Sequence, residues 1–246
     1  MSLSTAPLST VTATHPMNVV IPSLEPIYFQ AAPAVSRIRT TIDGDWTKQL
    51  PVLAGRRLTM RELLPSDAGS LLSMLSAAEV AKFISPPPTT LQGFQKFVRW
   101  TISERQAGRQ FTFGIVPEGC DHAVGIVQVR SIGPQFSVAE WGFALGSAYW
   151  GTGLFLAGAC MTLDFAFECA SIHRLEARAA VENARGNGVL RKLGAVQEGR
   201  LRRSLLKDGR YLDQFMWSIV ENDWMRARGI CGEVVAERVK AQSLTM

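Results

Sequence analysis

The stretch Val138–Glu168 reads VAEWGFALGSAYWGTGLFLAGACMTLDFAFE, and it predicts an apolar strand, a loop with two glycines and then a proline-free helix. Backbone N–H groups converge where such a loop enters a helix, and the helix dipole there favours negative charge. Gly151 and Gly153 would let a ligand approach the backbone closely. The stretch is therefore interpreted as a phosphate site. A tight turn that needs glycine for its shape alone is an equal alternative for the loop taken by itself.

Two known phosphate-binding motifs do not describe this loop. No Gly-Lys-Ser/Thr follows the glycines, so it is not a Walker loop. Leu156 stands where a dinucleotide fingerprint has its third glycine. The sequence around the loop has to decide between the two interpretations.

Further motifs follow the loop in a fixed order. After Tyr149–Leu154 in the loop itself, they are Leu163–Glu168, His173–Arg178, Glu182–Ala184, Val189–Gly194, Glu198–Arg202 and Asp208–Asp213. Together they resemble the GNAT superfamily of acyl-CoA N-acyltransferases, in particular the RimJ/RimL-type branch, which acetylates protein N-termini. The resemblance runs from about Arg57 to Trp224. It implies a single-domain GNAT fold of the α/β (α+β) class, with a central mixed, mostly antiparallel sheet flanked by helices.

Length and composition set the domain organisation. The chain has 246 residues, 47% of them hydrophobic, which is enough for one sizeable core with extensions. Residues 1–52 are rich in Ser, Thr, Pro and Ala and predict an extended or disordered arm. Residues 53–228 are expected to form the GNAT N-acetyltransferase domain, and residues 229–246 a C-terminal tail.

Cysteine usage and hydropathy indicate a compartment. The four cysteines form no C-x-x-C pair and have no metal-ligand spacing with the three histidines. This pattern favours a reduced, cytoplasmic protein without a metal site. No apolar run reaches the roughly 18 residues of a transmembrane helix, so no membrane partner is expected.

The formal net charge is +5, and part of the excess lies in one basic cluster. Its members are Arg191, Lys192, Arg200, Arg202, Arg203, Lys207 and Arg210. The cluster is interpreted as a solvated face or, alternatively, as a rim that attracts an anionic coenzyme or an acidic partner. Glu176 and Asp213 are expected to fix loops or to pair with these cations.

Periodicity and turn signals predict the order of elements. Strands are expected at 58–63, 110–116, 123–131, 138–145, 174–181, 197–206 and 211–220, and helices at 65–76, 90–107, 154–169, 184–193 and 222–228. Asp208-Gly209 predicts a hairpin turn between the last two strands. The triproline Pro86–Pro88 excludes helix, and in the fold that the resemblance implies it would form a wall of the acceptor site.

Acyl transfer to an amine requires loss of the amine proton, polarisation of the thioester carbonyl and stabilisation of the leaving thiolate. By resemblance, Glu140 is the candidate proton acceptor, with a structural or substrate-orienting role as the alternative. The family's Ser that can protonate the thiolate is replaced by Gly186. Tyr211 is then the candidate general acid by resemblance, or no acid is needed, because a thiol can also leave as thiolate. His173, at a strand edge, is interpreted as structural.

The resemblance also assigns the coenzyme contacts, with acetyl-CoA as cosubstrate and no metal. The expected contacts are Trp150, Gly151, Thr152, Gly153, Leu154 and Phe155 for the pyrophosphate, and Phe143, Ala144, Leu145 and Asn183 for the pantetheine arm. Where the family's serine is missing, Asn187 could hydrogen-bond the sulfur but is a poor proton donor. Asn183 is also a preferred helix N-cap residue and could fill both roles. Phe155 departs from the small residue usual in the family, and its ring would crowd the phosphates or point into the core.

These observations predict an N-acetyltransferase that moves an acetyl group from acetyl-CoA to a primary amine by direct attack. The acceptor is a protein or peptide N-terminus or a small-molecule amine, and a homodimer is an open option. The alternative is a non-catalytic acyl-CoA-binding regulatory module on the same fold, which Phe155 and Gly186 favour and which Glu140 and Asn183 disfavour. Nucleic-acid binding through the basic cluster is not expected, because no recognised reading motif accompanies it.

Overall fold

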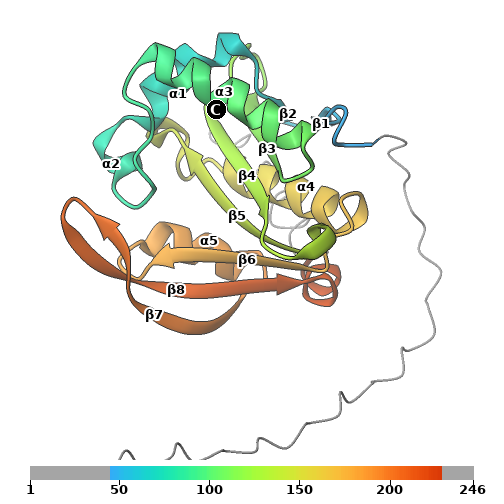
Figure 1. Ribbon diagram of the computed structural model, residues 1–246, viewed down its shortest axis with the longest axis vertical. Helices are drawn as coiled ribbons and strands as arrows, with labels where there is room; N and C mark the ends of the chain where they lie inside the picture. The colour runs from blue at the N-terminus through green and yellow to red at the C-terminus, as the bar shows by residue number, and fades with distance from the viewer. Residues whose placement is uncertain (1–44, 229–246) are drawn as a thin grey trace, which may run out of the picture. The chain divides into compact units, whose positions relative to one another are not determined.

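The computed structural model describes residues 45–228, which form one eight-stranded sheet with helices on both faces (Figure 1). The strands are β1 (Leu53–Ala54), β2 (Leu58–Glu62), β3 (Gln110–Pro117), β4 (Gly125–Ser131), β5 (Val138–Leu145), β6 (Arg174–Ala180), β7 (Val196–Lys207) and β8 (Arg210–Val220). The helices are α1 (Ala68–Leu75), α2 (Ala78–Ala81), α3 (Leu91–Gln106), α4 (Leu154–Glu168) and α5 (Ala184–Lys192), and residues 221–228 are also helical. The sheet order is β1-β2-β3-β4-β5-β6-β8-β7.

Every neighbouring pair of strands is antiparallel except β5 and β6, which run parallel. Helix α4 makes the crossover between these two strands, because parallel neighbours need a connection long enough to return to the same end of the sheet. The mixed, mostly antiparallel sheet expected from the sequence is thereby confirmed.

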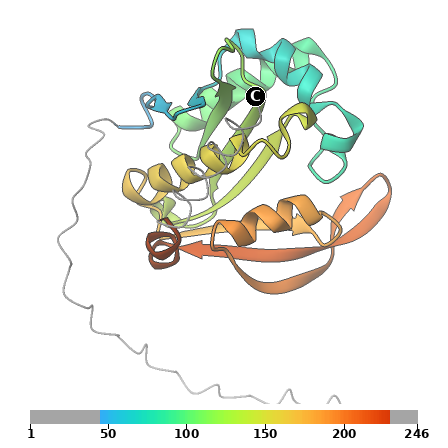
Figure 2. The ribbon, with the colours of Figure 1, turned by 180° about the vertical axis from the view of Figure 1, so that it is seen from behind.

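The two faces of the sheet carry two apolar cores. On one face α1 and α3 pack over β3 and β4, around buried side chains such as Leu71, Phe94 and Val98. On the other face α4 covers the sheet, and this helix lies in front when the molecule is seen from behind (Figure 2). Helix α4 is buried on most of its surface because its sequence is apolar almost all round. Alternation along β5 directs Trp141 and Phe143 to the α4 face and Ala144 to the α1–α3 face.

Asp67 fixes the start of α1 against the sheet. The buried Asp67 carboxylate accepts both terminal nitrogens of Arg61, at 2.8 and 2.9 Å, and the backbone N–H groups of Leu64 and Ala123 at 2.7 and 2.9 Å. Burial alone would raise the pKa of Asp67, but these hydrogen bonds and the Arg61 charge lower it below its ordinary value. A fully paired buried carboxylate thus joins strand β2, helix α1 and the turn before β4.

The packed chain begins before residue 53, the expected start of the domain. Leu50 is buried, and the Trp46 ring makes edge contacts with Phe111 at 5.5 Å and with Phe136 at 5.1 Å. The boundary placed at residue 52 therefore falls inside packed structure. The rest of the expected N-terminal arm, residues 1–44, and the expected tail, residues 229–246, lie outside the described residues.

Two of the four cysteines, Cys120 and Cys169, carry free thiols. Cys231 lies outside the described residues, so the expectation of a reduced protein stays a prediction. Within the described part of the chain, no helix is both long and apolar enough to cross a membrane.

Candidate functional site

Strands β5 and β6 separate after a short paired segment and open the sheet. Their parallel pairing joins Val138–Glu140 to Arg174–Glu176 and goes no further. Beyond this point β5 still pairs with β4 as far as Leu145, and β6 still pairs with β8 as far as Ala180. Each strand therefore follows a different half of the sheet, and the two diverge in Figure 1. Among the described strands, the edge of β5 beyond Glu140 has no partner on the β6 side.

Two cavities meet at this split. The first, here called the loop cavity, has a volume of about 670 Å³ and lies between the loop before α4 and the start of α5. The second, the sheet cavity, has a volume of about 840 Å³ and lies over β4, β5 and β6 on the face that carries α3. Residues of both β5 and α5 border both spaces, namely Phe143, Ala144, Asn183 and Gly186. A long ligand could pass from one cavity into the other.

The loop before α4 has the backbone geometry that its glycines allow. Gly151 and Gly153 adopt left-handed conformations, with φ of 78° and 84°, and both line the loop cavity. The N–H groups in the first turn of α4 have no partner within the helix. Two residues of that turn, Phe155 and Leu156, line the same cavity. The helix N-terminus can therefore receive an anion there.

Thr152 and Leu154 have structural roles in this loop. The Thr152 hydroxyl donates to the Tyr149 carbonyl at 2.8 Å and accepts the Leu154 N–H at 3.2 Å. Leu154 is buried in the core, and neither residue lines one of the two cavities. Both residues therefore stabilise the conformation of the loop without bordering either cavity.

Trp150 and Arg185 connect the loop to α5 across the loop cavity. The Trp150 indole N–H donates to the Leu145 carbonyl at 2.9 Å, and the Arg185 guanidinium lies 4.0 Å from the ring centroid. This distance is that of a cation–π contact. Arg185 and Lys192 bring two positive charges to the cavity, against the single carboxylate of Glu79 among its described lining residues.

Phe155 does not close the loop cavity. Its ring packs on Phe143 with centroids 4.3 Å apart, and both residues line the cavity wall. The bulky side chain that replaces the family's small residue is therefore directed onto β5 by an aromatic partner.

The two asparagines of the 183–187 segment differ in what they can reach. Asn183 borders both cavities, and its side-chain oxygen accepts the Gly186 N–H at 2.9 Å, so it is the N-cap of α5. A Cβ at Gly186 would lie 2.6 Å from the Asn183 amide nitrogen, so a serine there would displace the cap. Asn187 is buried. Its amide donates to the Ala180 carbonyl at 2.9 Å and accepts the Trp217 indole N–H at 2.9 Å. Asn187 lines neither cavity.

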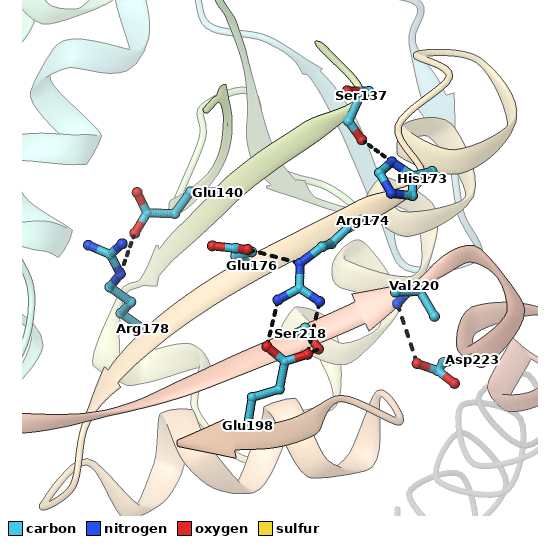
Figure 3. Close-up of polar contacts among 10 residues, drawn as sticks. All are labelled: Ser137, Glu140, His173, Arg174, Glu176, Arg178, Glu198, Ser218, Val220 and Asp223. Atoms are coloured by element: carbon cyan, nitrogen blue, oxygen red, sulfur yellow. Dashed lines mark hydrogen bonds and ion pairs between the residues drawn. The ribbon is translucent and has the colours of Figure 1, made fainter. Parts of the chain in front are cut away.

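Glu140 lies on the floor of the sheet cavity between two arginines. Arg130, its cross-strand partner on β4, donates to one carboxylate oxygen at 2.5 Å. The Nε of Arg178 on β6 lies 3.8 Å from the other oxygen, a contact drawn in Figure 3. To accept a proton, this carboxylate would have to weaken its contact with Arg130. The geometry suits a substrate-orienting role as well as a proton-accepting one.

Tyr211 lies apart from the cavities. It is 56% exposed at the start of β8, where Arg203 lies 5.4 Å from its ring centroid, and it lines neither space. The hydroxyl groups that do line the cavities belong to Tyr149 and Ser85. Burial, followed by the nearby Cys120 thiol, raises the pKa of Tyr149 above its ordinary value. Tyr149 directly precedes Trp150 in the sequence. This position next to the glycine loop could have identified Tyr149 as a residue of the loop cavity.

The basic cluster lies mainly on the β7–β8 hairpin, and of its members only Lys192 lines the loop cavity. As expected, Asp213 pairs with these cations. The Asp213 carboxylate lies 2.7 Å from the Arg200 guanidinium and accepts the backbone N–H of Arg203 at 2.8 Å. These contacts stabilise the irregular turn of β7. Most of the cluster is therefore a separate face of the molecule.

The carboxylates and histidine outside the cavities form a structural network (Figure 3). Arg174 donates to both oxygens of Glu198, at 2.9 and 2.6 Å, and to Glu176 at 2.9 Å. His173 contacts the Ser137 carbonyl at 2.8 Å, in keeping with the structural role expected for it. Within residues 45–228, no group of three or more metal-ligating side chains comes together.

Sequence reasoning missed three arginines and one glycine that border the cavities: Arg130, Arg178, Arg185 and Gly142. Arg130 lies opposite Glu140 because β4 and β5 pair in one particular register. Strand alternation could have placed both residues on the same face, but the register could not be predicted from the sequence. The triproline Pro86–Pro88 does line the sheet cavity, where a wall was expected.

Comparisons with known proteins agree with this arrangement. The family described as "Acetyltransferase (GNAT) domain" matches residues 57–196. The uncharacterized N-acetyltransferase p20 of Bacillus licheniformis is 26% identical over 176 residues, which cover 71% of this chain and 99% of p20.

Solved structures show a shared fold. Mycobacterium smegmatis RimJ in complex with CoA-disulfide has a TM-score of 0.65 and 22% identity, covering 78% of this chain and 94% of that one. The ribosomal-protein-S5-alanine acetyltransferase from Vibrio fischeri has a TM-score of 0.65 and 22% identity, covering 71% of this chain and 98% of that one.

Proposed function

The chain belongs to the GNAT family of N-acetyltransferases, which use acetyl-CoA, and we propose that it binds acetyl-CoA across the split between β5 and β6 and acetylates a primary amine held in the sheet cavity. The observation that carries the proposal is the meeting of two cavities at that split. One has the backbone and charge of an anion site, and the other holds polar groups under an apolar roof.

The coenzyme end of the site is proposed to be the loop cavity. The pyrophosphate would accept N–H groups from the first turn of α4, next to Gly151 and Gly153. Arg185 and Lys192 would balance its charge. Thr152 and Leu154, predicted as direct contacts, would instead act through the loop conformation that they stabilise.

The pantetheine arm is proposed to lie along the open edge of β5. Phe143 and Ala144 border both cavities, and an extended amide chain can pair with a free strand edge as a peptide does. Asn183 borders the same passage from the opposite side. Asn187 is a poor candidate for a contact to the sulfur, because its amide is already bonded within the protein.

In the proposed reaction, the neutral amine nitrogen attacks the thioester carbonyl carbon, a C–N bond forms, and the C–S bond breaks. The sulfur leaves with the bonding electrons, and the amine loses one proton to water or to Glu140. The N-terminus of α5 would place partial positive charge near the departing thiolate, which reduces the need for a general acid. Tyr211 would have to move from the surface to take that role.

Two coupled assays test the proposal. Titration calorimetry with acetyl-CoA measures binding, and release of free thiol is then followed over a panel of peptides and small amines. The proposal expects saturable binding and thiol release that depends on one class of amine. Binding without release on any amine would favour the regulatory module instead, and absence of binding would contradict the proposal as a whole.

A further inference from the structure

The sheet cavity contains more positive than negative charge. Among the described residues that line it, Arg130 and Arg178 are the cations and Glu140 is the only carboxylate. A purely cationic acceptor, such as a polyamine, would meet one unbalanced positive charge there. The charge pattern favours a ligand that brings an anionic group with its amine.

Both arginines have guanidinium N–H donors that remain available to a ligand. A guanidinium carries five N–H donors in a planar fork. Arg130 uses one nitrogen on Glu140, and Arg178 contacts the same carboxylate at 3.8 Å, which is longer than a hydrogen bond. Within residues 45–228 neither side chain makes another hydrogen bond or ion pair, and their side chains are 59% and 48% exposed. The remaining donors suit a planar carboxylate of the ligand.

The floor of the cavity is open beside these arginines. Gly142 on β5 and Arg178 on β6 both line the sheet cavity, each two residues beyond the last pair, Glu140 and Glu176, that joins the two strands. A Cβ built at Gly142 would meet no atom within 4 Å. The next residue on the same face of β5 is Ala144, which borders both cavities. A small ligand over Gly142 would thus contact Arg178 at one end and the passage between the cavities at the other.

The roof of the cavity is apolar, whereas the remaining lining includes the uncharged polar side chains of Ser85, Gln110, Gln128, Asn183 and Gln214. The roof is formed largely by aromatic and proline residues of α3 and of the segment before it: Phe83, Pro86, Pro87, Pro88, Phe94 and Phe97. Such a roof accommodates a hydrocarbon or aromatic body. The cavity therefore combines a cationic floor with an apolar roof.

We propose that the acceptor is a free α-amino acid with an apolar or aromatic side chain. Its carboxylate binds Arg130 and Arg178, its side chain packs against the phenylalanine and proline wall, and its amine points toward Ala144. This assignment rests on the proposed function and defines its substrate class. It differs from acetylation of a protein N-terminus, where the first residue carries an amide instead of a carboxylate.

Three matched acceptors test the assignment. With acetyl-CoA saturating, kcat/KM is measured for L-phenylalanine, for L-phenylalaninamide and for a short peptide that begins with phenylalanine. The proposal expects the free amino acid to exceed both others by about tenfold or more, because only it carries the carboxylate. Equal or better turnover of the amide or the peptide would overturn the assignment and leave the proposed function standing.

The variant Arg178→Gln tests the carboxylate contact of this arginine separately from the rest of the site. Arg178→Gln is expected to raise KM for L-phenylalanine about tenfold, to leave KM for phenylalaninamide unchanged, and to leave acetyl-CoA affinity unchanged. Arg109→Gln, which breaks an ion pair with Glu104 outside both cavity linings, is the control for loss of one positive charge. An equal KM change for both acceptors in Arg178→Gln would contradict the carboxylate contact. Absence of acetyl-CoA binding to the wild-type protein would instead contradict the proposed function.

Discussion

Glu140 is the residue whose role depends most on its surroundings. The family resemblance predicted a place beside the acceptor amine for this residue, and the structure adds Arg130 at 2.5 Å and Arg178 at 3.8 Å. An ion-paired carboxylate can orient both arginines toward a ligand even where it takes no proton itself. Loss of a proton acceptor lowers kcat, whereas loss of a substrate-orienting contact raises KM for the acceptor.

We predict that Glu140→Gln lowers kcat about a hundredfold or more at neutral pH if Glu140 accepts the amine proton. The matched control is Glu176→Gln, which changes the register partner of Glu140 on β6 and should leave kcat within a few-fold of wild type, because Glu176 lines neither cavity. Steady-state kinetics on both variants decide the matter. A nearly normal kcat with a raised acceptor KM in Glu140→Gln would assign the residue to substrate orientation.

Single residues also show where sequence reasoning ends. Asn183 and Asn187 stand four positions apart in one segment and were both expected to contact the coenzyme. Only the fold shows that Trp217, thirty positions later, donates to the Asn187 oxygen and withdraws it from the cavity. Tyr211 was assigned by its place in a motif, which does not reveal that its ring lies on the surface under Arg203. Contacts between distant segments decide such cases.

The glycine loop is the element on which coenzyme binding depends in the proposed function. Gly153→Ala places a Cβ on a residue with φ of 84°, which costs roughly 1 kcal/mol of backbone strain and shifts the start of α4. We predict a loss of acetyl-CoA affinity of about tenfold or more in calorimetry.

Gly119→Ala is the control for this change. Gly119 also has positive φ, 76°, and open space for a Cβ, but it lies in the turn between β3 and β4 and lines neither cavity. Its substitution should cost similar stability and leave affinity unchanged. Equal affinity losses in the two variants would show that the loop has no special role.

The Arg174–Glu198 pair ties β6 to β7 and gives a pH-dependent contribution to stability. Hydrogen bonds from Arg174 and then from Ser218 lower the pKa of Glu198 to about 2, from an ordinary value of 4.5. The contribution is therefore complete above pH 4.5 and is lost as the pH falls toward 2, since the unfolded chain takes up the proton first. At the 40% exposure of this side chain, about 1 kcal/mol or less is expected.

Denaturation of wild type and Glu198→Gln between about pH 3 and 7 measures this contribution. The difference in unfolding free energy should be constant near neutrality and should shrink as the medium becomes more acidic. A difference that does not vary with pH would rule out the ion pair as its source.

At the scale of the element, the sequence predicted much of the architecture. The helix expected at 154–169 is observed as Leu154–Glu168, and the strand expected at 174–181 as Arg174–Ala180. Long apolar runs and glycine or proline boundaries make such elements local properties of the chain. The short β1 and α2 were missed because elements of two and four residues carry too little periodicity. The irregular turn of β7, held by Asp213, is likewise a product of pairing with β8.

In the molecule as a whole, the site arises where two halves of the sheet part. Segments that are distant in sequence form the rims of the sheet cavity: the triproline segment on one side and the β7–β8 hairpin, through Leu205 and Gln214, on the other. Lys207 joins them by donating to the Ile84 carbonyl at 3.3 Å. No sequence pattern reports such a meeting, so the glycine loop and the triproline wall could be predicted, whereas the full outline of the sheet cavity could not.

The central claim is that the coenzyme lies in the β5–β6 split with its phosphates on α4. Hydrogen–deuterium exchange of the full chain, with and without acetyl-CoA, tests it directly. The claim predicts slower exchange in peptides that cover residues 141–146, 151–157 and 183–188, and no change in the β7–β8 hairpin. Binding that leaves the first two segments unprotected, or that protects the hairpin instead, would place the coenzyme elsewhere and contradict the claim.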